Sequence, residues 1–306
     1  MDKKTITREI DDLKMLESLA SAYAEISSSR MKNTRESVLS NRFFLSEIDE
    51  IFKELRLSYR RELLKLAKKR GLKKGNKITL LGHNGKTVAL LISANTGLYG
   101  DLTRQIFESF MKEVERTDVE ASIVGKLGRS LFIGRDPNRP YSYFEMPDNT
   151  IDREELANLI RHLVQYEEIH VYYGKFSSII YQSPSTFNIS AQTELVSAEE
   201  TKESKDKDKL TKYFFEPTLE EILIFFEREM FTSVFEQAIH ESQLAKFASR
   251  MIAMDQASER VRQTLKIVEI DHLKVTHNLA NKKQTNVFPG IMSFRANYVW
   301  KKLMMA

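Results

Sequence analysis

Two glycine-containing segments have residue types that could bind a phosphate group. The first, residues 82–87 (GHNGKT), ends like a phosphate-binding loop. The complete pattern needs a Gly five residues before Gly85, where this chain has Leu80. It also needs a helix after the loop, where this sequence indicates a strand. The segment therefore favours a hairpin turn between residues 77–81 and 87–93 over a nucleotide site.

The second segment, residues 97–101 (GLYGD), follows a predicted strand and opens a predicted helix. Phosphate groups bind the free N–H groups at such a helix N-terminus. However, the segment lacks GxGxxG spacing, and the carboxylate of Asp101 would repel an anion. The favoured interpretation is a tight strand-to-helix turn.

The six histidines do not form a metal-ligand pattern, because none is paired with another His or a carboxylate at a supporting spacing. They are His83, His162, His170, His240, His272 and His277. The last two lie five residues apart on a predicted helix and therefore on different faces. No nucleophile constellation or carboxylate pair is evident either. We predict no catalytic residue, no bound cofactor and no metal site.

The main predicted element is a helix over residues 218–287, with no Pro or Gly between Pro217 and Pro289. At 1.5 Å per residue it would be roughly 100 Å long, too long for a compact domain, so it needs a partner along its length. Its apolar and small residues step alternately by four and three, which is the spacing of a coiled-coil seam. The seam comprises Phe247, Met251, Met254, Ser258, Val261, Leu265, Val268, His272, Val275 and Leu279.

A second long helix is predicted over residues 5–69, ending before Gly71. It shows the same four-three stepping, with small residues in its middle that permit close helix approach. Its seam comprises Ile6, Ile10, Leu13, Ala20, Ala24, Ser27, Met31, Thr34, Val38, Leu45, Ile48, Phe52 and Leu55. The first and last helices are therefore predicted to form one antiparallel coiled coil.

The residues between the two helices alternate between strand and helix patterns, which indicates βαβ units and a mostly parallel sheet. Strands are predicted at 77–81, 87–93, 119–124, 168–175 and 178–182, with residues 130–133 as a candidate extension of the strand at 119–124. Helices are predicted at 101–116 and 151–165, and a loop at 136–148. The predicted fold class is α/β, with a small Rossmann-like domain inserted into a long antiparallel coiled coil.

The predicted division of the chain has five parts. Residues 1–70 and 218–288 form the coiled coil, and residues 71–196 form the α/β domain. Residues 197–217 include a stretch dense in both charge signs, which favours a flexible loop. Residues 289–306 follow a break at Pro289-Gly290 and form a tail, either a short docking helix or a frayed end.

The composition excludes several classes of protein. A net charge of +4 is spread along the chain, whereas nucleic-acid binders concentrate basic residues in a patch. The absence of Cys excludes disulfides and thiolate metal sites and fits a reducing compartment. No signal-peptide pattern and no run of eighteen apolar residues is present, so neither secretion by a standard signal nor a membrane span is predicted.

Four segments, in order, resemble motifs of the gamma subunit of F-type ATP synthases, the central-stalk rotor. Residues 97–103 (GLYGDLT) resemble "GLCGGLN", with Tyr99 in place of Cys, Asp101 of Gly and Thr103 of Asn. Residues 27–32 (SSSRMK) resemble "AASKMR", and residues 171–182 (VYYGKFSSIIYQ) resemble "VYNKFKSALSQ". Residues 248–254 (ASRMIAM) resemble "AARMVAM". The resemblance extends over about residues 5–290.

The resemblance implies partner contacts instead of an active site. Arg30, Met31 and Lys32 match the family segment that faces the acidic loop of the catalytic subunit. Arg250 matches a C-terminal helix arginine that contacts the head, and Met254 belongs to the same motif.

The family's terminal "RQASITQELTEIV" has poor counterparts here. An ungapped alignment lays it over residues 276–288, so that His277 replaces Gln, Asn281 replaces Thr and Lys283 replaces Glu. A gapped alignment places "ITQEL" on residues 275–279. We prefer the ungapped one because an unbroken coiled coil tolerates a shift badly. We expect His277, Asn281 and Lys283 to contact the head, and the Lys-for-Glu change implies an altered partner contact.

The resemblance implies a rotor that couples ion flow through a membrane ring to conformational cycling of a catalytic head during ATP synthesis. The implied partners are a hexameric ring of catalytic and non-catalytic ATPase subunits, a small epsilon-type stalk subunit and a membrane rotor ring. The implied location is the cytoplasmic face of the membrane. Two alternatives stay open at this point: a gamma-like shaft of a divergent ATPase motor, and a coiled-coil scaffold with an α/β binding module.

Overall fold

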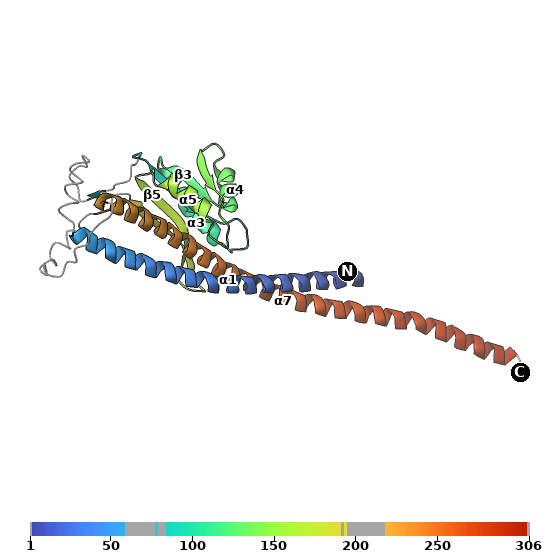
Figure 1. Ribbon diagram of the computed structural model, residues 1–306. Helices are drawn as coiled ribbons and strands as arrows, with labels where there is room; N and C mark the ends of the chain where they lie inside the picture. Colours follow the sequence, from blue (N-terminus) through green and yellow to red (C-terminus); the bar gives the residue numbers. More distant parts are fainter. Residues whose placement is uncertain (1, 59–76, 79–83, 191–192, 195–217, 305–306) are drawn as a thin grey trace. The chain divides into compact units, whose positions relative to one another are not determined.

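The computed structural model describes residues 2–58, 77–78, 84–190, 193–194 and 218–304 (Figure 1). It divides into two compact units. One comprises Ile26–Ala253, and the other comprises Met1–Glu25 with Met254–Ala306. Helices α1 (Lys3–Ser58) and α7 (Leu219–Met304) each contribute to both units.

The two long helices pair within each unit. In the unit of Ile26–Ala253, Arg42 forms an ion pair with Glu241 at 3.3 Å, and Asn41 Nδ2 donates to the carbonyl of Ser233. In the other unit, Glu17 accepts from Arg262 Nε at 2.6 Å. Later residues of α1 thus meet earlier residues of α7, so the pairing is antiparallel, as predicted.

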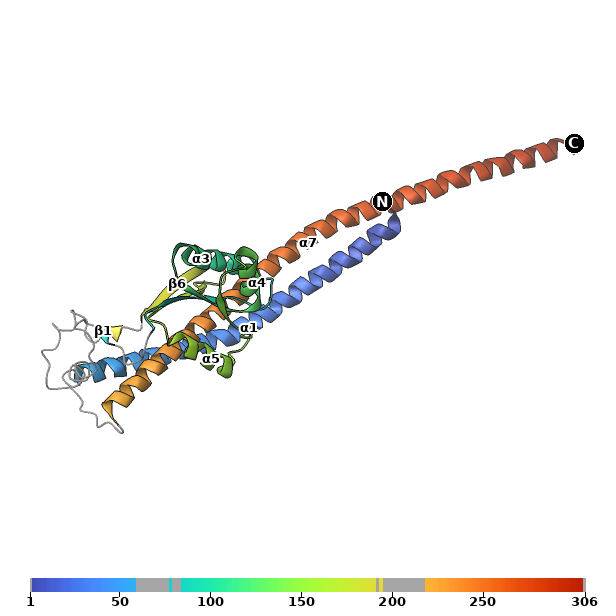
Figure 2. The same cartoon turned by 90° about the horizontal axis from the view of Figure 1, so that it is seen from above.

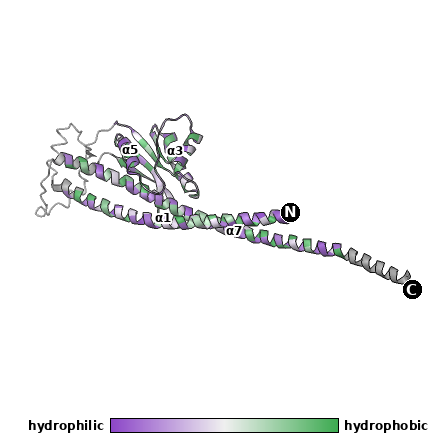
Figure 3. Ribbon diagram, turned by 45° about the vertical axis from the view of Figure 1, so that its right-hand side comes forward, coloured by the Kyte–Doolittle hydropathy of each residue, from purple (hydrophilic) through white to green (hydrophobic). Residues whose placement is uncertain are grey.

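The predicted seams are the buried faces of these helices. Along α1, the buried seam residues are Ile6, Ile10, Ala20, Ser27, Thr34, Val38 and Ile48. Along α7, they are Phe247, Met254 and Ser258, whereas Leu279 is exposed. Hydrophilic and hydrophobic residues alternate along both helices (Figure 3).

The ends of both helices differ from expectation. Helix α1 is described to Ser58, and the remainder of the predicted 5–69 helix lies outside the described residues, as does the charged loop at 197–217. The predicted break at Pro289-Gly290 is wrong, because α7 continues to Met304. A proline inside a helix removes one backbone hydrogen bond at a cost of about 3 kcal/mol. The other hydrogen bonds of such a long helix remain available on both sides of Pro289.

A five-stranded sheet occupies the unit of Ile26–Ala253, with strand order β4-β3-β2-β5-β6. Its strands are β2 (Thr87–Ile92), β3 (Glu120–Val124), β4 (Tyr141–Phe144), β5 (Glu168–Phe176) and β6 (Gln182–Ser190). All pairings are parallel except β5 with β6. The connecting helices are α3 (Leu102–Arg116), α4 (Lys126–Arg135) and α5 (Arg153–Leu163). The predicted mostly parallel α/β insert is confirmed.

The alternation of side chains along β2 divides the core between the two faces of the sheet. Val88, Leu90 and Ile92 pack with α5 and with α7 residues around Phe235. The intervening Ala89 and Leu91 pack on the other face with α3 and α4. Figure 2 shows α3 and α5 on opposite sides of the sheet. The sheet is therefore covered on both faces, which explains the near-continuous apolar sequence of β2.

Local pairing differs from the prediction at residues 77–93. Strand β1 (Lys77–Ile78) pairs antiparallel with β7 (Thr193–Glu194), not with β2. Strand β2 has β3 and β5 as its neighbours, so the predicted hairpin is wrong. An apolar run and a turn pattern do not say which partner a strand will take, because that depends on contacts distant in sequence.

Three further local predictions are wrong. Residues 130–133 lie in helix α4 instead of a strand; its buried residues Gly128 and Phe132 are four apart, which is helical spacing. The predicted loop 136–148 contains β4, which is formed by pairing with β3. Residues 178–181 form a turn, in which the N–H groups of Ser177 and Ser178 donate to Tyr181 O, and β6 begins only at Gln182.

Candidate functional site: a buried junction between the sheet and helix α7

The loop after β2 has a backbone that depends on its glycine and lies close to α7. Leu98 has φ 70° and Gly100 has φ 58°, both in the left-handed region. A Cβ on Gly100 would lie 3.1 Å from the hydroxyl oxygen of Ser249. A non-glycine residue such as Leu98 in this region is strained, and such strain gathers at functional positions. The predicted strand-to-helix turn at 97–101 is confirmed.

The carboxylate of Asp148 accepts several hydrogen bonds from this loop. It accepts the N–H groups of Asn95 and Thr96 at 3.0 and 3.1 Å, the Thr96 hydroxyl at 3.0 Å and the Tyr99 hydroxyl at 3.1 Å. Asp148 is 8% exposed, and a buried carboxylate is stable only with such a set of donors.

Lys246 of α7 supplies the opposite charge. Its Nζ donates to the carbonyl of Ser93 at 2.9 Å and to Asp148 at 3.4 Å, and its side chain is 6% exposed. Burial by itself raises the pKa of Asp148, but the Lys246 ammonium and the N–H donors of Asn95 and Thr96 outweigh it and hold this pKa below its ordinary value. Burial also lowers the pKa of Lys246, which Asp148 opposes. We assign a charged pair, because the Asp148 carboxylate, whose pKa lies below its ordinary value, faces the Lys246 amine and favours its ammonium form.

Arg250 and Ser249 complete the junction one turn further along α7. The Arg250 guanidinium lies 3.9 Å over the ring of Tyr99 and donates to the Thr96 hydroxyl at 2.8 Å and the carbonyl of Gly97 at 2.9 Å. The Ser249 hydroxyl donates to the carbonyl of Tyr99 at 2.7 Å. Tyr99 is 2% exposed, and burial raises its pKa to about 12, so its hydroxyl stays protonated.

This set of contacts can transmit force but offers no chemistry. Lys246, Ser249 and Arg250 lie at i, i+3 and i+4, so one face of α7 carries all three. Their partners Ser93, Thr96, Gly97 and Tyr99 lie on the loop that leaves the central strand β2. The contacts of Lys246 and Ser249 are buried, so water cannot easily replace them, and those of Arg250 with Thr96 and Gly97 are partly buried. We name this set, with Asp148, the junction.

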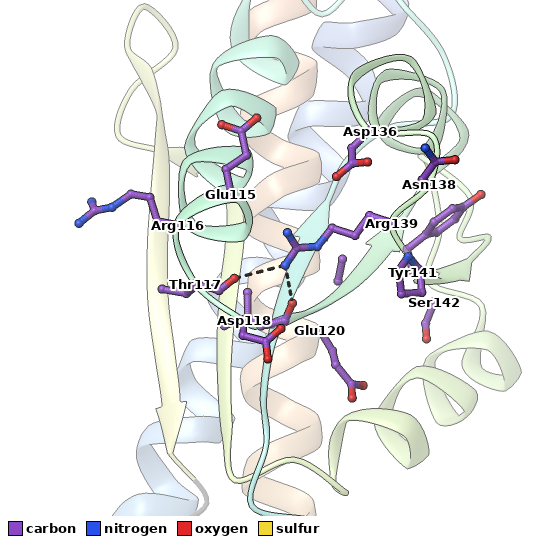
Figure 4. A pocket seen from close by; sticks show the side chains of 13 residues that line it. Glu115, Arg116, Thr117, Asp118, Glu120, Asp136, Asn138, Arg139, Tyr141 and Ser142 are labelled. Carbon is purple, nitrogen blue, oxygen red and sulfur yellow. Dashed lines mark hydrogen bonds between the residues drawn. The ribbon is translucent and has the colours of Figure 1, made fainter.

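A second feature, a depression of about 820 Å³, lies at the amino ends of β3 and β4 (Figure 4). Three of its charged side chains, Glu115, Glu120 and Arg139, are already bonded within the chain. Arg139 donates to the carbonyls of Thr117 and Val119, Glu115 accepts from Arg135, and Glu120 accepts from Lys86 and Tyr166. Ligand sites of open parallel sheets form at the carboxyl ends of the strands instead. We therefore do not assign it as the functional site.

The phosphate-loop-like segment and two of the histidines singled out in the sequence lie in ordinary structural contacts where they are described. Lys86, of the phosphate-loop-like segment 82–87, forms an ion pair with Glu120 at 2.7 Å, while residues 82–83 lie outside the described residues. The ring of His162 lies near the Ser122 hydroxyl at 3.1 Å, and His170 lies 3.4 Å from Glu113. Among residues that the structure describes, no group of three His, Cys, Asp or Glu side chains could hold a metal ion.

The predicted contact residues occupy different environments. Met31 packs against the cluster of Ala94, Tyr99 and Phe247, beside the junction, and Arg30 is half-buried while Lys32 is exposed.

On α7, Arg250 is 8% exposed and bonded inside the chain, and Met254 is 9% exposed. His277, Asn281 and Lys283 are exposed, and Asn281 Nδ2 lies 3.2 Å from His277 Nδ1. Contact of these residues with a partner stays a prediction.

Sequence reasoning missed Lys246 and Asp148. A weak indication existed for Lys246, which is a charged residue within the apolar and small stretch 244–249 (LAKFAS) next to seam residue Phe247. No comparable indication marked Asp148, which lies 98 residues earlier in a segment predicted to be loop.

Comparison with known proteins places these features in a family. A protein of Laribacter hongkongensis named ATP synthase gamma chain is 23% identical over 291 residues, covering 91% of this chain and 93% of its own. The ATP synthase gamma chain of Geotalea uraniireducens is also 23% identical, covering 86% and 88%. A family model described as ATP synthase matches residues 2–276. The chain belongs to the ATP synthase gamma family.

Solved structures agree on the fold of this gamma subunit. A chain of the Tetrahymena thermophila mitochondrial ATP synthase central stalk and c-ring has a TM-score of 0.57 at 18% identity, covering 78% of this chain and 99% of its own. A chain of the Euglena gracilis mitochondrial ATP synthase has a TM-score of 0.53 at 14% identity, covering 88% and 96%. The predicted family, and the fold of paired long helices with an inserted α/β sheet, are therefore confirmed.

Family membership also decides the type of function. A gamma subunit is the non-catalytic central-stalk rotor of an ATP synthase, a membrane-bound complex, and the comparisons favour this role over the scaffold and divergent-motor alternatives. Among the residues described, no helix is both long and apolar enough to cross a membrane.

Proposed function

We propose that this gamma subunit turns inside a hexameric ring of catalytic and non-catalytic ATPase subunits, with a small epsilon-type stalk subunit and a membrane rotor ring as its further partners. Ion flow through the membrane ring drives the rotation. Because the shaft is asymmetric, it presents a different surface to each catalytic subunit at each rotational angle. It therefore binds and stabilises a different pre-existing conformation in each of them. We place the α/β unit on the cytoplasmic face of the membrane.

The junction is the observation that carries this proposal. A rotor must pass torque between its sheet and its long helices without slipping. Lys246 and Arg250 of α7 are bonded to the loop of β2 at 2.8–2.9 Å, and Asp148 accepts the N–H group of Asn95 in the same loop. The buried members of this set, Lys246, Asp148 and Ser249, have one favourable geometry, because displacing them would leave polar groups unpaired in a low-dielectric interior.

The contact surfaces follow from the gamma-family motifs. We propose that Arg30, Met31 and Lys32 face the acidic loop of a catalytic subunit. Arg250 and Met254 lie in the motif that meets the head, and His277, Asn281 and Lys283 engage it further along α7. Since His277, Asn281 and Lys283 are exposed in this chain, they are free to meet a partner.

Native mass spectrometry of the tagged chain, purified gently from its own cells, tests this proposal. The expected assembly has one copy of this chain with three copies each of two nucleotide-binding subunits, and a fuller preparation also contains a membrane ring. An assembly with the nucleotide-binding subunits but never a membrane ring would indicate a divergent motor. Recovery of the chain alone or as a homodimer, under conditions that preserve such complexes, would overturn the rotor proposal.

A further inference from the structure

A groove of about 590 Å³ lies between α5 and the early part of α7, away from the junction. Its floor is apolar: Leu156 and Ile160 are buried core residues, and Val164 is half-buried beside them. Ala157, on the exposed side of α5, adds a small side chain that leaves the floor accessible. Apolar surface of this kind gains free energy when a partner covers it.

The rim of the groove is positively charged. Arg153 and Arg161 rise from α5 and Arg228 from α7, and all three are exposed. Arg161 is held by the side chain of Asn158 at 2.5 Å, but no carboxylate among the described residues forms an ion pair with Arg153 or Arg228. The one carboxylate in the lining is Glu236, which is half-buried, and burial raises its pKa. The positive charge of Arg153 opposes this rise in the pKa of Glu236, so Arg153 is partly compensated inside the groove. Arg228 has no carboxylate partner among the described residues and is the more available cation.

We propose that this groove docks an amphipathic helix of another protein chain, with its apolar ridge on Leu156, Ile160 and Val164 and its acidic side chains on Arg153 and Arg228. The combination of a concave apolar floor with a cationic rim matches a helix whose apolar stripe is flanked by Asp or Glu. Guanidinium groups form paired hydrogen bonds with carboxylates, so the rim fixes the position of the helix as well as attracting it.

Two other occupants fit less well. A membrane surface is broad and flat, whereas this site is recessed between two helices. A small phosphate ligand would meet Glu154 and Glu155 in the first turn of α5, beside Arg153, and an apolar floor that cannot solvate it. An acidic helix satisfies both the floor and the rim.

Site-specific photo-cross-linking in the assembled complex identifies the occupant. A benzophenone amino acid replaces Ala157 in the full chain, and in a control it replaces Glu154, which is exposed on α5 but does not line the groove. The purified complex is irradiated and the captured peptide is sequenced. We expect the Ala157 position alone to capture one segment of a different chain, with apolar residues at helical spacing and Asp or Glu beside them.

Charge reversal then tests the recognition. The captured segment is synthesised and its affinity for the full chain is measured for Arg153→Glu and Arg228→Glu. We expect each variant to bind at least about tenfold more weakly at moderate salt, with a smaller salt dependence than the wild type. Lys112→Glu, an exposed cation on α3, is the matched control and should leave the affinity unchanged.

Several results would overturn the proposal: capture of lipid, of a second copy of this chain, of a segment without acidic residues, or of nothing at Ala157. Equal affinity of the peptide for wild type and Arg153→Glu would overturn it as well. Failure of this proposal can be distinguished from failure of the rotor proposal. The subunit composition of the purified complex tests the rotor proposal, whereas the cross-linked segment tests only the occupant of the groove.

Discussion

Lys246 and Asp148 illustrate how a charged pair can be held inside a protein. Removing two ions from water costs several kcal/mol each, so a buried pair is weak evidence for stability. The pair matters here because it keeps Asp148 ionised and in place, and Asp148 also accepts hydrogen bonds from Asn95, Thr96 and Tyr99. We interpret the pair as an interaction that favours a single arrangement of the loop after β2 against helix α7.

The first prediction concerns the loss of one partner. Lys246→Met leaves the buried carboxylate of Asp148 without its counter-ion, and we expect the free energy of unfolding to fall by about 3 kcal/mol. Urea titration followed by circular dichroism measures the change. Lys126→Met, which breaks the exposed ion pair with Glu145, is the control and should change stability little. Equal effects of the two substitutions would show that the buried pair has no special role.

The second prediction concerns how the stability contributed by Asp148 depends on pH. The pKa of Asp148 in the folded chain lies below its ordinary value of 3.8, so its ionised form is favoured by folding. The resulting stability is fully present above that ordinary value and is lost as the pH falls through the folded-state pKa. We therefore expect the difference in unfolding free energy between wild type and Asp148→Asn to be constant above about pH 5 and to shrink below about pH 4. A difference that does not depend on pH would contradict this assignment.

At the scale of the element, helix α4 shows how closely the connections are packed against the sheet. A Cβ on Gly128 would lie 2.6 Å from the Cβ of Ser93, at the end of β2. Gly125 has φ 100°, and a Cβ there would lie 2.9 Å from the backbone of Ala94. The start of α4 therefore lies directly against the strand end from which the junction loop departs.

The third prediction uses two glycines of the same helix. Gly128→Ala introduces a clash with Ser93, so we expect a loss of about 1–3 kcal/mol in unfolding free energy. Gly134→Ala meets nothing within 4 Å and should stabilise α4 by roughly 0.5–1 kcal/mol, because alanine favours the helix. Thermal and urea unfolding of the two variants measure both changes. Similar results for the two would mean that α4 is packed more loosely than described.

At the scale of the whole molecule, large apolar side chains are exposed on the part of α7 that belongs to the second unit. Ile267, Ile270 and Leu273 are 63%, 53% and 67% exposed. Burying one such side chain fully is worth about 2 kcal/mol. The proposed rotor function places this surface inside the catalytic head, whereas the chain alone leaves it in water.

The fourth prediction follows from that exposure. The variant with Ile267→Gln, Ile270→Gln and Leu273→Gln should self-associate less than the wild type when the chain is purified alone, because less apolar surface meets water. The same variant should recover fewer ATPase subunits from cells. Light scattering and pull-down measure the two effects, with the exposed substitution Lys266→Gln as the control. Unchanged recovery of ATPase subunits would show that this surface does not meet the head.

The sequence alone was sufficient for the two long helices, their antiparallel pairing and the α/β character of the insert. Those features depend on periodicity within a segment: Ile6, Ile10 and Ala20 on α1 and Met254 and Ser258 on α7 are buried at the predicted seam positions. The junction loop at 97–101 was predicted as a turn for a similar local reason.

Only the tertiary structure decided the features that join distant segments. The partner of β1, the existence of β4 and the pairing of Lys246 with Asp148 are of this kind. Each depends on the balance between a local preference and contacts made elsewhere in the chain. The groove between α5 and α7 is a further case, because its floor and rim come from two helices whose approach is set by the core beneath them.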